Sequence, residues 1–111
     1  MKTLLVVLFL AVFSSNASAG GWFTENGEVE FLHIEKGLVL ANINATDRKY
    51  FDGCDSTDGV IINDDTENGK RQYALILSAF SAGKKVKIYT SGCHTEWGQK
   101  YPQVWAVRAM N

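Results

Sequence analysis

The sequence predicts a mainly β domain with one helix, and two observations carry this prediction. After residue 20 most segments alternate apolar and polar residues with the period of two of half-buried strands, whereas one segment changes to the period of a helix. The expected elements follow the order β-β-β-α-β-β, which is that of a five-stranded OB-like barrel. An open α+β sheet with the helix on one face is the alternative that the pattern leaves open.

The first three strands are predicted from short apolar or alternating runs. Val29–Ile34 and Leu38–Ile43 flank Glu35-Lys36-Gly37, whose shortness and glycine are typical of a hairpin connection. A polar stretch, Asn44–Gly59, comes next. Val60–Ile62 then predicts a short third strand.

The helix is predicted from about Asn68 to Ala82. Thr66 or Asn68 can cap its start, and Gly83 lies where a C-terminal glycine cap belongs. Four apolar residues at the spacing i, i+3, i+4, i+7 form one stripe, which we expect to face the sheet. They are Tyr73, Ile76, Leu77 and Phe80.

Two strands are expected after the helix. Lys85–Thr90 alternates cleanly, with Val86 and Ile88 on one face, and Val104–Met110 is the last strand. The polar segment between them, Ser91–Pro102, is predicted to be a loop. Its length is at the upper end for ordinary connections, and long loops in compact domains are often functional.

The first 19 residues have the three parts of a secretory signal peptide. Lys2 supplies a positive charge, Leu4–Phe13 is an almost unbroken apolar run, and Ala17-Ser18-Ala19 is an A-x-A cleavage signature. A membrane anchor is the alternative, but the run of about ten residues is much shorter than the ~20 that span a bilayer. We therefore predict cleavage after Ala19, a secreted or periplasmic protein, and one small domain over residues 20–111.

The chain contains two cysteines, Cys54 and Cys93, and in an exported protein such a pair most often forms one disulfide. Free or metal-binding thiols are the alternative. The formal net charge is −1 at pH 7. This balance argues against a nucleic-acid partner, because nucleic-acid binders need a concentrated basic face. It also gives no attraction to an anionic membrane surface.

The segment Tyr73–Ala79, together with Ala82–Tyr89, resembles the helix-to-strand part of small secreted bacterial proteins built like toxin B subunits. It is similar in particular to the pertussis-like and subtilase-cytotoxin-like receptor-binding subunits. The resemblance implies an OB fold, a disulfide, binding of a glycan or protein partner, and a homo-oligomeric ring. No residue of their sugar-binding site has a match in this sequence. The same segment also resembles small exported bacterial proteins of no known function.

No arrangement in the sequence indicates an enzyme, a metal site or a cofactor. There is no G-x-S-x-G elbow, and Cys93 beside His94 offers no thiolate if Cys93 is in a disulfide. The histidines have no metal-ligand spacing, and His33 lies in a strand pattern that predicts partial burial. Asn63–Gly69 begins like a calcium loop but has Leu75 where the loop needs a glutamate.

Aromatic residues give the strongest indication of function. Trp97 and Tyr101 lie in the expected loop among polar residues, and Trp105 alternates with its apolar neighbours in the last strand. Such rings suit sugars or protein partners, with completion of a small core as the alternative for each. We predict Trp97, Tyr101 and Trp105 as ligand-binding residues of an exported, non-enzymatic binding module. A structural or accessory envelope protein with no ligand site is the alternative function.

Overall fold

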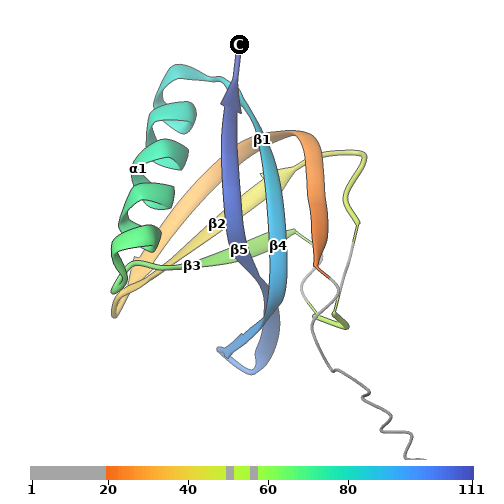
Figure 1. Cartoon of the computed structure of the whole chain (residues 1–111), viewed down its shortest axis with the longest axis vertical. Helices are drawn as coiled ribbons and strands as arrows, with labels where there is room; N and C mark the ends of the chain where they lie inside the picture. The colour runs from red at the N-terminus through yellow and green to blue at the C-terminus, as the bar shows by residue number, and fades with distance from the viewer. Residues whose placement is uncertain (1–19, 50–51, 56–57) are drawn as a thin grey trace, which may run out of the picture.

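The computed structural model describes residues 20–49, 52–55 and 58–111, so the predicted signal peptide, residues 1–19, lies outside the described residues. Five strands and one helix follow the predicted order (Figure 1). They are β1 (Gly21–Glu35), β2 (Leu38–Asn44), β3 (Gly59–Asn63), α1 (Glu67–Ala82), β4 (Lys85–Glu96) and β5 (Gln99–Met110).

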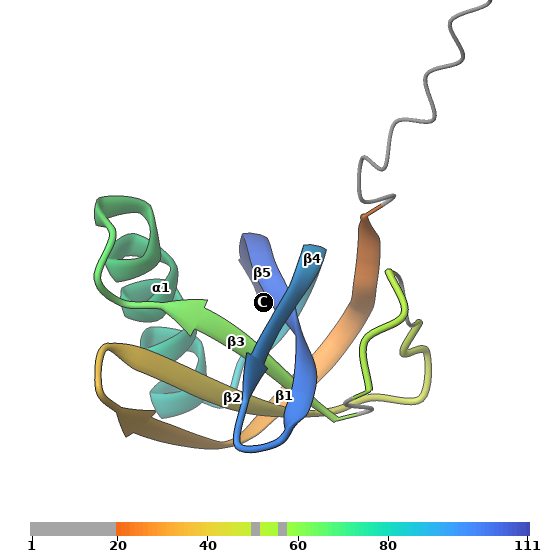
Figure 2. The same cartoon turned by 90° about the horizontal axis from the view of Figure 1, so that it is seen from below.

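The five strands hydrogen-bond in a closed ring in the order β1-β2-β3-β5-β4, with β4 returning to β1. Every neighbouring pair is antiparallel except β3 and β5, which are parallel and meet at Ile61 and Gln103. The closure excludes the open sheet and confirms the predicted OB-like, mainly β class. The helix α1 packs against β5, β1 and β3 at one side of the ring, and residues 52–55 lie at the opposite side (Figure 2).

The hydrophobic core fills the inside of the ring and the space below α1. Alternate residues of β2 and β4 are fully buried, as their period of two predicts, and Val60 and Ile62 of β3 join them. Ile61 is also fully buried although it points to the other face of β3, outside this core cluster. The short strand β3 is therefore covered on both faces.

The predicted helix is confirmed to within one residue at its start. Thr66 is the N-cap, and its hydroxyl accepts a hydrogen bond from the Gly69 backbone N–H at 2.9 Å. Gly83 is the C-cap, and its backbone N–H bonds the last turn.

The predicted core-facing stripe of α1 is wrong for two of its four members. Leu77 is 39% exposed and Phe80 is 40% exposed, whereas Ile76 is fully buried and Tyr73 is half-buried. The buried face consists of Gly69, Gln72, Ile76 and Ala79. Small side chains at two of these positions allow the helix to approach the ring closely, and Gln72 is tolerated there because its amide donates to the Trp105 carbonyl at 2.9 Å.

Two further expectations are corrected in the strands. The expected loop Ser91–Pro102 is a β-hairpin, because β4 continues to Glu96 and β5 begins at Gln99. Its turn consists of Trp97 and Gly98, with φ angles of 50° and 76°, the positive values that a two-residue type I′ turn requires. At the other end of the chain β1 begins at Gly21, well before the predicted start at Val29, and so includes Trp22 and Phe23.

The described residues contain no helix long and apolar enough to cross a bilayer. Within 20–49, 52–55 and 58–111, no three His, Cys, Asp or Glu side chains gather in a group that could hold a metal ion.

Candidate functional site

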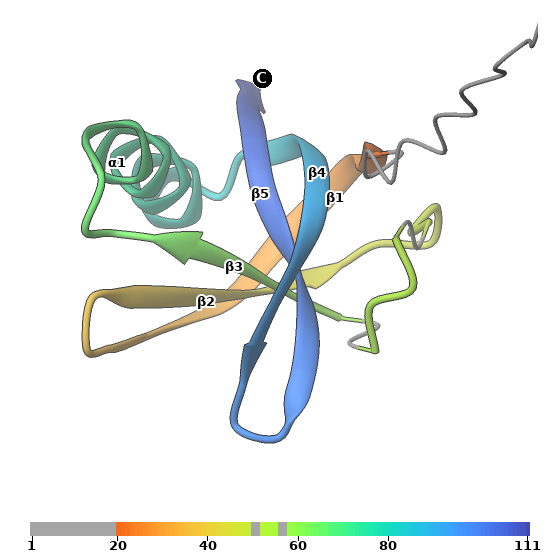
Figure 3. The same cartoon turned by 60° about the horizontal axis from the view of Figure 1, so that its bottom comes forward.

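The outer half of the β4–β5 hairpin projects beyond the core (Figure 3). Residues from Cys93 to Glu96 pair with residues from Pro102 back to Gln99, so the arms are held by backbone hydrogen bonds across the hairpin. No residue between Ser91 and Glu96 is fully buried. The side chains of the β4 arm are therefore at least partly exposed, whereas Pro102 of the β5 arm is fully buried.

The tip of the hairpin rests on β1 through an aromatic cluster formed by His33, Trp97 and Tyr101. The Trp97 ring lies 5.7 Å from the His33 ring and 5.8 Å from the Tyr101 ring, both in edge-to-face geometry. Trp97 keeps 41% of its surface exposed. His33, which the strand pattern predicted to be partly buried, is exposed because it is on the outer face of β1.

Glu35 places a carboxylate next to two members of the aromatic cluster, His33 and Trp97. Its carboxylate lies 3.1 Å from Nε2 of His33. This hydrogen bond, followed by one from the Trp97 indole, lowers the pKa of Glu35 below its ordinary value of 4.5. The charged carboxylate therefore orients both rings that it contacts.

A pocket of about 530 Å³ lies beside this cluster. Its walls come from β2, β3, β5 and the segment that precedes β3, so it is an open depression between the hairpin and the outer face of the sheet. Most of its lining is polar, and Tyr101 belongs to both the pocket and the aromatic cluster. The described residues that line it are Leu40, Asn42, Asp55, Asp58, Gly59, Gln99 and Tyr101.

Hydrogen bonds fix the polar side chains of this pocket in position. Asn42 donates from Nδ2 to Glu30 at 2.8 Å, and Asp58 lies 3.2 Å from the Arg48 guanidinium. Asp55 accepts from the Lys100 backbone N–H at 3.1 Å, and its own N–H donates to the Lys100 carbonyl at 2.7 Å. The pocket is thus largely formed before any ligand arrives.

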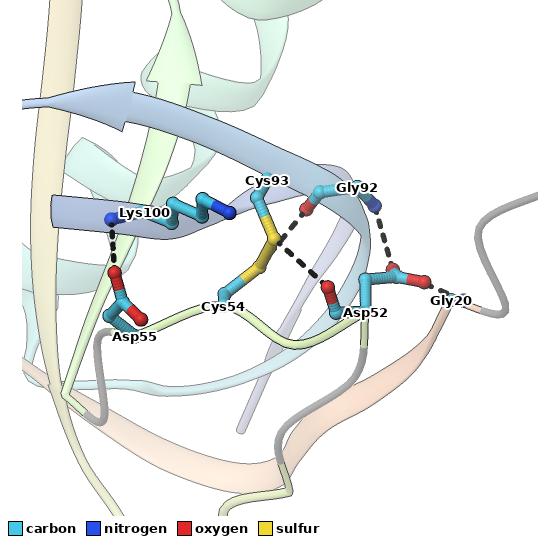
Figure 4. The surroundings of a disulfide bond; sticks show 7 residues. All are labelled: Gly20, Asp52, Cys54, Asp55, Gly92, Cys93 and Lys100. Carbon is cyan, nitrogen blue, oxygen red and sulfur yellow. Dashed lines mark hydrogen bonds between the residues drawn. A yellow bond between two sulfur atoms is a disulfide. The ribbon is translucent and has the colours of Figure 1, made fainter.

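The predicted disulfide between Cys54 and Cys93 is present, with the two Cα atoms 5.7 Å apart (Figure 4). It ties the segment that carries Asp55 to the start of the projecting half of β4. One covalent bond therefore holds the Asp55 side of the pocket against the hairpin, which also contributes to the lining.

Trp105, the third predicted ligand-binding residue, does not belong to the aromatic cluster. It is 65% exposed and lines a separate groove of about 260 Å³ between β5 and α1, next to Arg71 and Leu75. The structure therefore brings together two of the three predicted site residues, Trp97 and Tyr101, and places the third in another groove.

Sequence reasoning missed the polar half of the site, above all Asn42, Asp55 and Gln99. Asn42 carried a weak signal, since it is the first polar residue after Leu38 and Leu40 in the outward row of β2. The arrangement offers aromatic faces beside carboxylate and amide groups, which can accept hydrogen bonds from hydroxyl groups and pack against C–H surfaces. No family model, curated protein or solved structure matches this chain.

Proposed function

We propose that this protein is an exported, non-enzymatic binding module that holds a glycan in the pocket under the β4–β5 hairpin. The observation that carries the proposal is the pocket of about 530 Å³ with Tyr101 in its wall and Trp97 beside it. Its volume lies within the range of roughly 300–1,000 Å³ that is usual for small-ligand sites.

The chemistry of the lining fits a sugar better than an apolar ligand. Sugar rings present C–H faces that pack on aromatic rings, and hydroxyl groups that need partners once water is removed. Tyr101 and Trp97 supply the rings, while Asn42, Asp55 and Gln99 supply amide and carboxylate groups. Hydrogen bonds hold the side chains of Asn42 and Asp55 in place, which reduces the entropy lost on binding.

The negative charge of the pocket further narrows the class of ligand that it can bind. Asp55 and Asp58 line it, and Glu30 is hydrogen-bonded to Asn42 at its edge. Carboxylates at these positions repel phosphate and sulfate groups, so the favoured ligand is a neutral or amine-bearing sugar.

Export is the second part of the proposal. The Cys54–Cys93 disulfide is compatible with an oxidising compartment, and the Ala17-Ser18-Ala19 signature supports cleavage of residues 1–19. The resemblance of Tyr73–Tyr89 to toxin B subunits supports a glycan partner and assembly into a ring of identical subunits. These observations support a secreted or periplasmic location.

A glycan array probed with the exported protein tests the proposal, together with native mass spectrometry of the subunit stoichiometry. We expect binding to neutral or amine-bearing glycans that Gln99→Ala weakens about tenfold or more, since it removes a hydrogen-bonding group from the pocket. Gln103→Ala is the matched control, because this glutamine lies on the same strand and lines a different groove. Absence of glycan binding by the folded protein would favour a structural envelope protein with no ligand site.

A further inference from the structure

The backbone nitrogen of Gly20 lies next to a carboxylate. It donates to Oδ2 of Asp52 at 3.4 Å, and the same oxygen accepts from the Gly92 N–H at 2.8 Å (Figure 4). Asp52 therefore joins Gly20, the first residue of the predicted mature chain, to Gly92 of β4. The next residue of β4 is Cys93, which forms the disulfide.

Gly20 is seated closely against β4. A Cβ at this position would lie 3.1 Å from the Thr90 carbonyl oxygen and 3.3 Å from the Tyr89 hydroxyl. A larger residue would therefore be crowded here. This close packing defines the position of the Gly20 nitrogen relative to Asp52.

We propose that cleavage after Ala19 creates an ion pair between the new α-ammonium group of Gly20 and the carboxylate of Asp52. The inference rests on the proposal that residues 1–19 are a signal peptide that is cleaved after Ala19. Hydrolysis of the Ala19–Gly20 peptide bond by an export peptidase consumes one water molecule, leaves a carboxylate on Ala19 and converts the amide nitrogen of Gly20 into an ammonium group. A neutral N–H becomes a cation with three donors beside an anion that is already oriented.

The ion pair strengthens a row of attachments along residues 52–55. Asp52 binds Gly20 and Gly92, Cys54 is bonded to Cys93, and Asp55 exchanges hydrogen bonds with Lys100. Only the first of these attachments changes when the leader is removed. Processing therefore tightens the segment whose last described residue, Asp55, lines the pocket.

The test uses protein exported from the full chain with its own leader. Its N-terminal residue is identified by mass spectrometry, and its α-amine is then acetylated selectively, which restores the neutral amide of the precursor. We expect acetylation to raise the unfolding equilibrium constant about fivefold in the unmodified sequence, and to have no effect in Asp52→Asn. Glu30→Gln, which removes a negative charge elsewhere on the surface, should retain the full effect of acetylation.

Two results would overturn the inference, and they are distinct from a failure of the glycan proposal. A mature N-terminus at any residue other than Gly20 removes the cation from this position. An equal effect of acetylation with and without the Asp52 carboxylate shows that the charge acts elsewhere. Neither result depends on whether the pocket binds a glycan.

Discussion

The two halves of β4 are stabilised in different ways. In Lys85–Thr90 every second residue is buried, and the strand pairs with β1 on one side and β5 on the other. In Ser91–Glu96 none is fully buried, and the ladder described for this half connects it to β5 alone. Burial stabilises the first half, whereas the hairpin ladder, the disulfide and the contact of Trp97 with His33 hold the second.

This difference separates stability from ligand access along one strand. Because Ser91–Glu96 is not held in place by burial, its side chains can stay exposed while its backbone keeps its position. The disulfide and the aromatic contact each fix the projecting hairpin from outside the core. The same strand can therefore form the ring at one end and an exposed surface at the other.

Removal of the disulfide should show the largest effect in this comparison. With the cysteines 39 positions apart in the sequence, the Cys54→Ser, Cys93→Ser double variant should lose roughly 4 kcal/mol of unfolding free energy on a chain-entropy model. Hydrogen exchange in the native state should accelerate more in Ser91–Glu96 than in Lys85–Thr90. Equal acceleration in both halves, measured by mass spectrometry, would show that they are not held separately.

Substitutions within β4 sharpen the contrast. Ile88→Ala should lower the unfolding free energy by about 2–5 kcal/mol, because the isoleucine is fully buried in the ring. Thr95→Ala on the exposed half is the matched control and should change it by less than about 0.5 kcal/mol. Similar losses of unfolding free energy for both variants in urea titrations would show that the two halves of β4 are not stabilised in different ways.

The smallest expected effect is a pH-dependent loss of the contact that Glu35 makes with His33 and Trp97 at the hairpin tip. The pKa of Glu35 is lowered by His33 and Trp97, so the charged form favours this contact. The contact is complete above the ordinary pKa of 4.5 and is lost as the pH falls through the lowered value. Tryptophan fluorescence should follow this transition, and Glu35→Gln should abolish it. If Glu35→Gln shows the same fluorescence transition, a group other than Glu35 causes it.

The same division explains which elements the sequence predicted. Alternation of apolar and polar residues exists only where one face of a strand lies against the core, so Lys85–Thr90 was correctly predicted as a strand. The projecting half carries polar residues on both faces, together with Gly92 and Pro102, and was therefore predicted as part of a loop. The signal that remained was the glycine of the Trp97-Gly98 turn.

The site was predictable only where single residues carry the signal. The exposed aromatics Trp97 and Tyr101 stand out among polar neighbours, and Cys54 and Cys93 were predicted to pair because they are the two cysteines of the sequence. Asn42, Asp55 and Gln99 meet only after the ring closes, since they come from three separate segments. The orientation of α1 depended in the same way on Gly69 and Ala79, which carry little hydrophobicity but allow close packing.

The central claim is that the projecting hairpin binds a ligand and is not needed for the core, and Trp97→Ala tests it most directly. Thermal stability and affinity for a glycan found on the array are measured on the same preparation, with Trp105→Ala as the control from the other groove. We predict an affinity reduced at least tenfold with a melting temperature nearly unchanged, whereas the control keeps its affinity. A melting temperature lowered by several degrees, with binding per folded molecule intact, would place Trp97 in the core and contradict the account.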